Sequence, residues 1–261
     1  MGLIEENHRY SYSQLQTVSE CPYSFYLQKI EHAEGLVQNA FASQGTLIHD
    51  ILDKWGKGEL TIEQMPEEYA ARYYKEVTQP WPKMLASKGY AEKAYDLGLE
   101  YFRNFDGFDG YEIIDTEQQF ETEIEGRPFI GIIDMILRDK STGELIVNDH
   151  KSKSLAAFKK AEHEMYRQQY LYSKAVYEKY GTYPDKLMFN LFKENGLKQT
   201  KPFFKEEYDE ALDWAVKQIE KIEQYEMIDW LETKQPDFFC TELCSCKVLC
   251  TNGKPQYKKK R

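Results

Sequence analysis

Long apolar runs are missing from this sequence of 261 residues. No stretch approaches the roughly 18 apolar residues that a membrane-spanning helix needs. The first ten residues, MGLIEENHRY, also lack the basic-then-apolar order of a secretory signal. Internal repeats and low-complexity linkers are absent as well, which argues against a repeat architecture. We therefore expect a cytoplasmic protein with no membrane partner.

An excess of positive charge is also missing. The chain carries 34 Lys and Arg against 44 Asp and Glu, a net charge of -10. This argues against a protein that coats nucleic acid through bulk charge, because phosphate binding depends on Lys and Arg. It does not exclude a nucleic-acid enzyme, which needs only a local basic surface. Two basic stretches qualify, Lys151–Lys160 and the tail Lys254–Arg261, although the tail is equally compatible with a solvated chain end.

What is present is typical of a globular protein. Hydrophobic residues make up 41% and charged residues 30% of the chain, and 20 Tyr and 14 Phe make it unusually aromatic. The length allows one large domain or two small ones. We expect a single domain, 1–261, in three parts: 1–104 mainly helical, 105–204 a catalytic sheet with a crossover helix, and 205–261 a helix, a cysteine cluster and a basic tail.

The first part of the chain shows helical signals. A short helix is expected over 13–20, and Pro22 suits the first turn of the next helix. Thr46, preceded by Gly45, is expected to cap a helix whose apolar side is Leu47, Ile48, Ile51, Leu52 and Trp55. Residues 62–104 are also predicted to be helical, with a break at Pro80 and Pro82.

The pattern changes to β-branched runs separated by turn residues from Tyr111 onward. Strands are expected over 111–124, 126–139 and 144–152, with a KSTG turn before the third. A helix over 156–180, a strand over 186–193, an Asn195-Gly196 turn, a partner strand reaching Phe204 and a helix over 205–234 complete the prediction. This order predicts a mixed α/β fold, in which a three-strand meander is followed by a crossover helix.

Two carboxylates lie inside the most apolar strands, Asp134 in GIIDMI and Asp149 in LIVNDHK. Burying a lone carboxylate is costly, so a partner is needed. If the turn pairs Arg138 with Leu145, the same register places Asp134 opposite Asp149. Lys151 would then share their face, while His150 points away. Such a set can hold a metal ion and stabilise charge on a phosphate; the alternative is a plain ion pair of Asp149 with Lys151, or of Asp134 with Arg138.

Three more residues are expected to lie near this hairpin in the folded protein. Glu117, on the preceding strand, can bring a third carboxylate into the site, or can simply face solvent. Gln168 and Tyr172 are four residues apart and so share one face of the crossover helix. Taken alone, they are ordinary core and surface residues.

Together these residues resemble the PD-(D/E)XK nuclease superfamily. Within it, they resemble the RecB-like branch, which includes CRISPR adaptation nucleases, AddB-type helicase-nucleases and many phage exonucleases. GIIDMI is similar to the G-x-x-D segment, which implies that Asp134 is a metal ligand. NDHKS is similar to the D-x-K segment, which implies Asp149 as a ligand and Lys151 as the catalytic lysine. His150 stands where the family often has Tyr.

The resemblance extends to two helical motifs and implies a restriction-endonuclease-like core. Gly45 and His49 match the G-x-x-x-H helix of the RecB-like branch, in which the His is a further metal ligand. Gln168 and Tyr172 match its Q-x-x-x-Y motif, whose residues lie beside the site and contact DNA. The joint occurrence of these motifs in the family's order is more specific than any one of them.

Cysteine is scarce but concentrated. Four of the five cysteines are Cys240, Cys244, Cys246 and Cys250, and the fifth is Cys21. In a reducing compartment such a cluster indicates metal binding rather than disulfides, and the local spacing permits zinc. The resemblance instead favours a 4Fe-4S cluster that staples the two ends of the chain, because RecB-like members have one such Cys near the N-terminus and three near the C-terminus.

The spacing departs from the family's C-x-x-C pattern, so the choice between Cys246 and Cys244 as a ligand stays open, with Cys21, Cys240 and Cys250 preferred first. Reduced thiols without a ligand remain the simplest alternative.

The resemblance implies a DNA exonuclease dependent on Mg²⁺ or Mn²⁺ that acts in DNA processing, recombination or repair. A helicase, a recombinase or a single-strand annealing protein is the expected kind of protein partner. Two alternatives from other classes are a non-catalytic DNA-binding or assembly subunit that retains the fold, and a zinc-stabilised interaction module.

Overall fold

The β-branched segments build a central six-stranded sheet. A computed structural model describes residues 7–250. Its strands are β1 (Tyr10–Ser11), β2 (Tyr111–Ile124), β3 (Arg127–Asp139), β4 (Leu145–Lys151), β5 (Lys186–Leu191) and β6 (Leu197–Pro202). β2, β3 and β4 form the predicted antiparallel meander, β4 and β5 run parallel, and β6 returns antiparallel to β5. β1 pairs in parallel with β3. The sheet is mixed, as predicted.

Local turn chemistry sets two of the connections. Glu125 and Gly126 join β2 to β3, and both have positive φ, as a two-residue hairpin turn of type I′ requires. Asn195 and Gly196 likewise adopt positive φ in the loop between β5 and β6. That loop is longer than predicted, because a short turn of 3-10 helix, η3 (Phe192–Glu194), follows β5.

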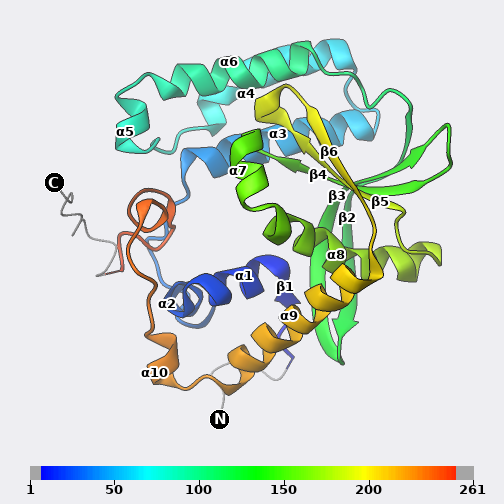
Figure 1. The fold of residues 1–261 in the computed structure, drawn as a ribbon. Helices are drawn as coiled ribbons and strands as arrows, with labels where there is room; N and C mark the ends of the chain where they lie inside the picture. Colours follow the sequence, from blue (N-terminus) through cyan, green and yellow to red (C-terminus); the bar gives the residue numbers. More distant parts are fainter. Residues whose placement is uncertain (1–6, 251–261) are drawn as a thin grey trace.

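Helices cover both faces of the sheet (Figure 1). The N-terminal half contains α1 (Tyr12–Glu20), α2 (Pro22–Phe25), η1 (Tyr26–Ile30), α3 (Ala40–Gly56), η2 (Ile62–Gln64), α4 (Met65–Glu76), α5 (Lys83–Ala86) and α6 (Tyr90–Arg103). The C-terminal half contains α7 (Leu155–Lys160), α8 (Glu162–Tyr180), α9 (Lys205–Gln224), α10 (Met227–Trp230) and η4 (Phe239–Leu243). None of the helices within 7–250 is long and apolar enough to cross a membrane.

Side chains alternate between the two faces of the sheet, so the apolar residues pack into two cores, one on each face. Ile136 and Val147 join the core formed with α1, α8 and α9. Met135 and Ile146 face the other way, into the core formed with α3, α4 and α6. Because successive side chains alternate, Asp149 and Lys151 share the face of Val147, whereas His150 lies on the face of Ile146.

The helix that was predicted to begin at a Thr46 cap starts earlier, so its predicted start was wrong. α3 begins at Ala40, where the side chain of Asn39 accepts a hydrogen bond from the Ala42 backbone N–H (3.1 Å). Thr46 lies inside the helix, and its hydroxyl donates to the Ala42 carbonyl. Asn is a strong N-cap, and the extra turn buries Gln44, whose amide donates to the Ala94 carbonyl at 2.7 Å. The prediction that His49 lies on a helix is confirmed.

Two long helices are shorter than predicted. The helix expected over 156–180 is interrupted at Ala161, whose φ of -110° and ψ of 15° separate α7 from α8. The helix expected over 205–234 ends at Gln224, because Tyr225 is extended. The chain then turns into α10, where Trp230 is fully buried and stacks on Phe25 at 5.2 Å.

The C-terminal segment packs on the N-terminal helices. The Tyr23 N–H donates to the Glu232 carbonyl, and the Val37 N–H donates to the Ser245 carbonyl, both at 3.0 Å. The side chain of Asn39, which caps α3, also donates to the Leu243 carbonyl. Segments more than 200 residues apart along the chain are thus joined directly. The expectation of a single domain stays a prediction.

Candidate active site

Asp134 lies on the central strand of the meander with an acidic residue on each side. β2 and β3 pair on both sides of Asp134 in one register, which places Glu117 opposite it. On the other edge of β3, the predicted pairing of Arg138 with Leu145 is confirmed, and its register directs Asp149 to the opposite side. Three strands therefore bring three carboxylates into a row.

The backbone pairing of β3 with β4 stops just before these carboxylates. Pairing between β3 and β4 ends at Met135 and Asn148, one residue before the carboxylates. Beyond that point the His150 backbone N–H donates to Asp134 Oδ2 (2.8 Å) rather than to the backbone of β3. Glu117 has a φ of 45°, which is uncommon for a residue other than glycine. The irregular backbone is local to the acidic residues, as is often found at functional sites.

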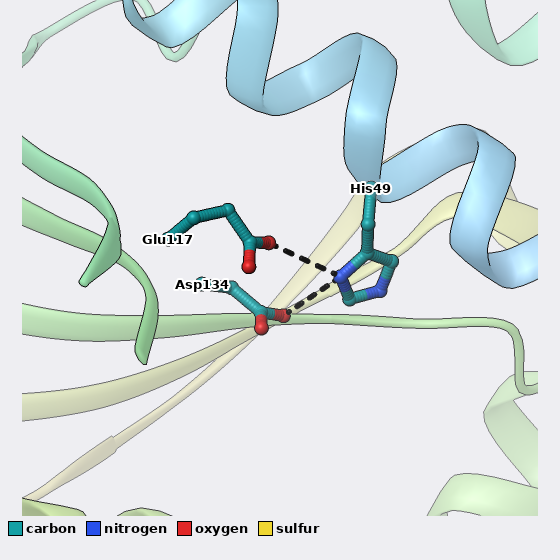
Figure 2. A group of neighbouring side chains, drawn as sticks. All are labelled: His49, Glu117 and Asp134. Carbon is teal, nitrogen blue, oxygen red and sulfur yellow. Dashed lines mark ion pairs between the residues drawn. The ribbon is translucent and has the colours of Figure 1, made fainter. Parts of the chain in front are cut away.

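His49 reaches the carboxylates from α3. Its Nδ1 atom lies 3.4 Å from Asp134 Oδ2 and 3.8 Å from Glu117 Oε1 (Figure 2). Its Nε2 atom lies 2.9 Å from the backbone carbonyl oxygen of His150. A carbonyl oxygen only accepts, so Nε2 carries a proton and donates, and Nδ1 is left facing the carboxylates. This is how proteins orient a histidine that binds a metal.

His49, Glu117 and Asp134 make a compact set of ligand atoms, all within 4.8 Å of one another. Within residues 7–250 this is the one group of three or more Cys, His, Asp or Glu side chains that is so close. Burial alone would lower the pKa of His49, but the charge of Asp134 and the hydrogen bond with Glu117 outweigh burial and raise that pKa to about 9. The carboxylates thus attract a cation to this position.

Asp149 is outside the compact set and faces Lys151 instead. Lys151 Nζ lies 2.8 Å from Asp149 Oδ2 and donates to Oδ1 at 3.0 Å. Burial raises the pKa of Asp149 to about 6, the charge of Lys151 opposes that rise, and Asp134 adds to it. Burial alone would lower the pKa of Lys151, but the charges of Asp149 and Asp134 raise it. The ammonium is therefore held charged beside the row of carboxylates.

Gln168 and Tyr172 extend this contact from α8. Lys151 Nζ donates to Gln168 Oε1 (3.3 Å), and the Gln168 amide donates to the Tyr172 hydroxyl (3.1 Å). Tyr172 packs edge-on against Phe120 of β2, with ring centroids 5.0 Å apart. A Cβ atom on Gly131 would lie 2.6 Å from the Phe120 ring and 3.0 Å from the Tyr172 ring, so this close packing requires glycine at Gly131.

An open cleft of about 670 Å³ leads to the compact set and is lined by His49, Glu117, Lys151 and Ser152. Gly45, one helical turn before His49, also lines it, and a Cβ atom there would meet nothing within 4 Å. A second groove continues past Tyr172 and shares Gln119 with the cleft. The site is thus accessible from two sides.

Sequence reasoning missed two contributors to this site. Phe41 lies on the same side of α3 as Gly45 and His49 and lines the same cleft. The four-residue spacing of these three residues would have revealed it. The His150 carbonyl, which orients His49, left no signal in the sequence. The His150 ring lies on the other face of β4 from Asp149 and Lys151, as predicted, and its Nδ1 accepts a hydrogen bond from the Asn190 amide (2.9 Å). It is still close to the site, because it packs edge-on against the His49 ring, with centroids 5.6 Å apart.

The five cysteines surround one cavity between the two ends of the chain. The cavity is lined by all of them: Cys21, Cys240, Cys244, Cys246 and Cys250. None forms a disulfide. Cys246 is buried, and its sulfur lies 3.6 Å from the hydroxyl of Ser24 on α2. A hydrogen bond between the two thiols lowers the pKa of Cys246 to about 6 and raises that of Cys244.

Comparisons with known proteins agree with this fold. No curated protein sequence matches the chain. A solved structure from Eubacterium rectale, described as a "Putative exonuclease", is similar with a TM-score of 0.50. The two sequences are 11% identical, and the match covers 98% of this chain and 90% of that one. A family model described as PD-(D/E)XK nuclease superfamily matches residues 9–251. This chain belongs to the PD-(D/E)XK nuclease superfamily.

Proposed function

We propose that this chain is a DNA exonuclease of the RecB-like branch that depends on Mg²⁺ or Mn²⁺. The observation that carries the proposal is the compact set of His49, Glu117 and Asp134 beside the pair of Asp149 and Lys151. Membership of the superfamily supports nuclease activity and a DNA substrate. The G-x-x-x-H and Q-x-x-x-Y motifs support the RecB-like branch, because their residues meet at one site.

The ligand atoms present suit a small divalent cation. Mg²⁺ and Mn²⁺ favour carboxylate oxygen, and an imidazole nitrogen is a common additional ligand for Mn²⁺. His49 Nδ1 faces Glu117 Oε1 and Asp134 Oδ2, and the ligand atoms of the three residues lie within 4.8 Å of one another. Asp149, the next carboxylate in the row, can complete the set. Such an ion polarises the phosphate and lowers the pKa of a bound water.

The protein side chains then have separate tasks. His49 stays oriented because Nε2 donates to the His150 carbonyl. Lys151 is held in place by Asp149 and Gln168, and its ammonium orients the attacking water or stabilises the charge that develops on the phosphate. Tyr172 and Gln168 border the path of the DNA.

Substitution of the Asp149–Lys151 pair tests catalysis. Asp149→Ala and Lys151→Ala should each abolish metal-dependent digestion of labelled single and double strands. Lys205→Ala is a matched control, because Lys205 is exposed and pairs with Asp209 within α9. Circular dichroism reports whether each variant is folded. Full activity in a folded Asp149 or Lys151 variant would refute the mechanism and would support a non-catalytic DNA-binding role.

Substrates labelled at one end separate exonuclease from endonuclease action. An exonuclease releases mononucleotides or short products from one end at the earliest time points. An endonuclease produces internal fragments first, and that pattern would contradict the exonuclease assignment. A role in recombination or repair, with a helicase, recombinase or annealing protein as partner, is part of the same proposal.

We also propose that the cysteine cavity holds a 4Fe-4S cluster. All five thiols line the cavity, and it lies between the N-terminal helices and the C-terminal segment. No three cysteine sulfurs within residues 7–250 lie within 4.8 Å of one another. A tetrahedral zinc site would place them roughly 3.8 Å apart, given Zn–S bonds of about 2.3 Å. No three of the thiols in the described chain are that close, and Cys246, the buried one of the five, contacts Ser24 of α2, which favours it over Cys244 as a ligand.

Anaerobic purification tests this assignment. A 4Fe-4S protein is brown with broad absorbance near ~400 nm and contains about four iron atoms per chain. A colourless protein with stoichiometric zinc would establish the zinc alternative. Cys246→Ala should remove the colour, whereas Cys244→Ala should retain it.

A further inference from the structure

Lys193, in the η3 turn after β5, lies on a cluster of three aromatic rings. Its Nζ atom is 4.3 Å from the centroid of the Phe41 ring and 5.8 Å from that of Tyr90. Trp81 packs against both rings, with centroids 4.8 Å from Phe41 and 5.1 Å from Tyr90. The ammonium is therefore positioned by ring faces contributed by α3 and α6.

Lys193 shares a small surface pocket with Glu100 and Glu194 but forms an ion pair with neither. In the described residues no carboxylate lies within ion-pair distance of Lys193, and the carboxylate of the adjacent Glu194 accepts a hydrogen bond from the Leu155 N–H (2.8 Å). The charged group that acts on Lys193 is another cation, Lys153. Burial, together with that like charge, lowers the pKa of Lys193 to about 8. At neutral pH the side chain is still mostly protonated, so two like charges lie close enough to repel each other.

The chain neighbours of both lysines, Phe192 and Ser152, line the catalytic cleft. Phe41, which supports Lys193, lines the same cleft as His49 and Lys151. Ser152 lines it too, and Lys153 is the next residue along the chain. An anion bound by the two lysines would therefore lie beside the compact set of metal ligands.

We propose that Lys193 and Lys153 form a binding site for a backbone phosphate of the DNA strand that enters the cleft, with Phe41 holding the Lys193 ammonium in place. A phosphate oxygen supplies the negative charge that the two ammonium groups lack. Because the aromatic rings already restrict Lys193, less side-chain entropy is lost when the phosphate binds. This inference rests on the proposed function and deepens it by assigning residues that contact the substrate outside the reacting centre.

Binding measured without cleavage tests the proposal. The probe is a fluorescein-labelled single-stranded oligonucleotide, titrated with the full chain in buffer containing EDTA, and anisotropy is followed over a range of salt concentrations. Lys193→Met and Lys153→Met should each weaken binding of different sequences by similar factors. Each should also reduce the slope of log affinity against log salt by about 0.7, the value for one single-strand phosphate contact.

Three further variants sharpen the result. Lys193→Arg should retain the wild-type slope, because it keeps the charge. Lys217→Met removes the same charge from an exposed position on α9 and should change neither affinity nor slope. Phe41→Leu should weaken binding while keeping the slope, because the ammonium remains but is no longer held by an aromatic ring. Wild-type affinity in Phe41→Leu would overturn the role given to the ring.

The result separates this inference from the proposed function. Wild-type affinity and slope in both Lys193→Met and Lys153→Met would overturn the phosphate site even if the protein digests DNA. A loss of slope in these variants would support the phosphate site even if no digestion is found. Failure of the wild-type chain to bind the oligonucleotide at all would overturn it as well.

Discussion

Metal binding at the candidate site should release about one proton at pH 7. The raised pKa of His49, about 9, means that its imidazole is almost fully protonated at pH 7. Nε2 keeps its proton for the His150 carbonyl, so the proton that leaves is the one on Nδ1. Asp149, with a pKa of about 6, adds only about 0.1 proton at this pH. A metal ion takes the deprotonated ligands, so both protons are displaced.

The pKa values of His49 and Asp149 also determine how the affinity for Mn²⁺ depends on pH. Where the pKa of a ligand in the metal-free protein lies above the working pH, a proton competes with the metal for that ligand. The apparent Mn²⁺ affinity should therefore rise about tenfold for each pH unit between pH 7 and pH 9, and then level off as His49 loses its proton without metal. Below pH 6 the slope should steepen, because Asp149 then binds a proton as well.

Isothermal titration calorimetry with Mn²⁺, in buffers of different ionisation enthalpy, counts the released protons directly. His49→Ala should release fewer protons than the wild type at pH 7 and should lose the rise in affinity as pH approaches 9. Its release should exceed about 0.1 proton, because loss of the His49 charge raises the pKa of Asp149. His163→Ala, on the exposed side of α8, is the matched control and should behave as wild type. Equal proton release by the wild type and by His49→Ala would refute the assignment of His49 as a ligand.

Three other substitutions test packing around the site and at the chain ends. Gly45→Val should reduce digestion strongly with little change in melting temperature, because a Cβ atom at this position meets no protein atom within 4 Å and Gly45 lines the cleft. Gly131→Ala should destabilise the fold by about 1–3 kcal/mol in urea denaturation, since the new methyl group would overlap the Phe120 ring. Trp230→Ala should cost about 3–5 kcal/mol by the same measurement, because Trp230 is fully buried against Phe25. Unchanged activity in Gly45→Val, or unchanged unfolding midpoints in the other two, would contradict these readings.

Local patterns predicted most of the sheet. The strand over 111–124 has the predicted bounds, and the next two differ by a residue at their ends. The pairing of Arg138 with Leu145 is confirmed, because a short turn between two alternating strands leaves few possible registers. That register was enough to bring Asp134 and Asp149 to neighbouring strands.

Helix ends were predicted less well, because tertiary contacts decide where a helix stops. α3 starts six residues before Thr46, at an Asn39 cap whose side chain also bonds the C-terminal segment. α9 stops at Gln224 so that Trp230 can be buried against an N-terminal helix. Neither partner is near in sequence, and local propensity does not detect either of them.

The sequence by itself determined the mixed α/β class, the acidic hairpin and the helical position of His49, since each follows from periodicity or spacing within about 20 residues. Only the tertiary structure decided that Glu117, rather than Asp149, joins His49 and Asp134 in the compact set. That outcome depends on the opening of the sheet and on a carbonyl that lies 101 residues from the imidazole it orients. Such contacts arise when distant segments pack, so they leave no local pattern in the chain.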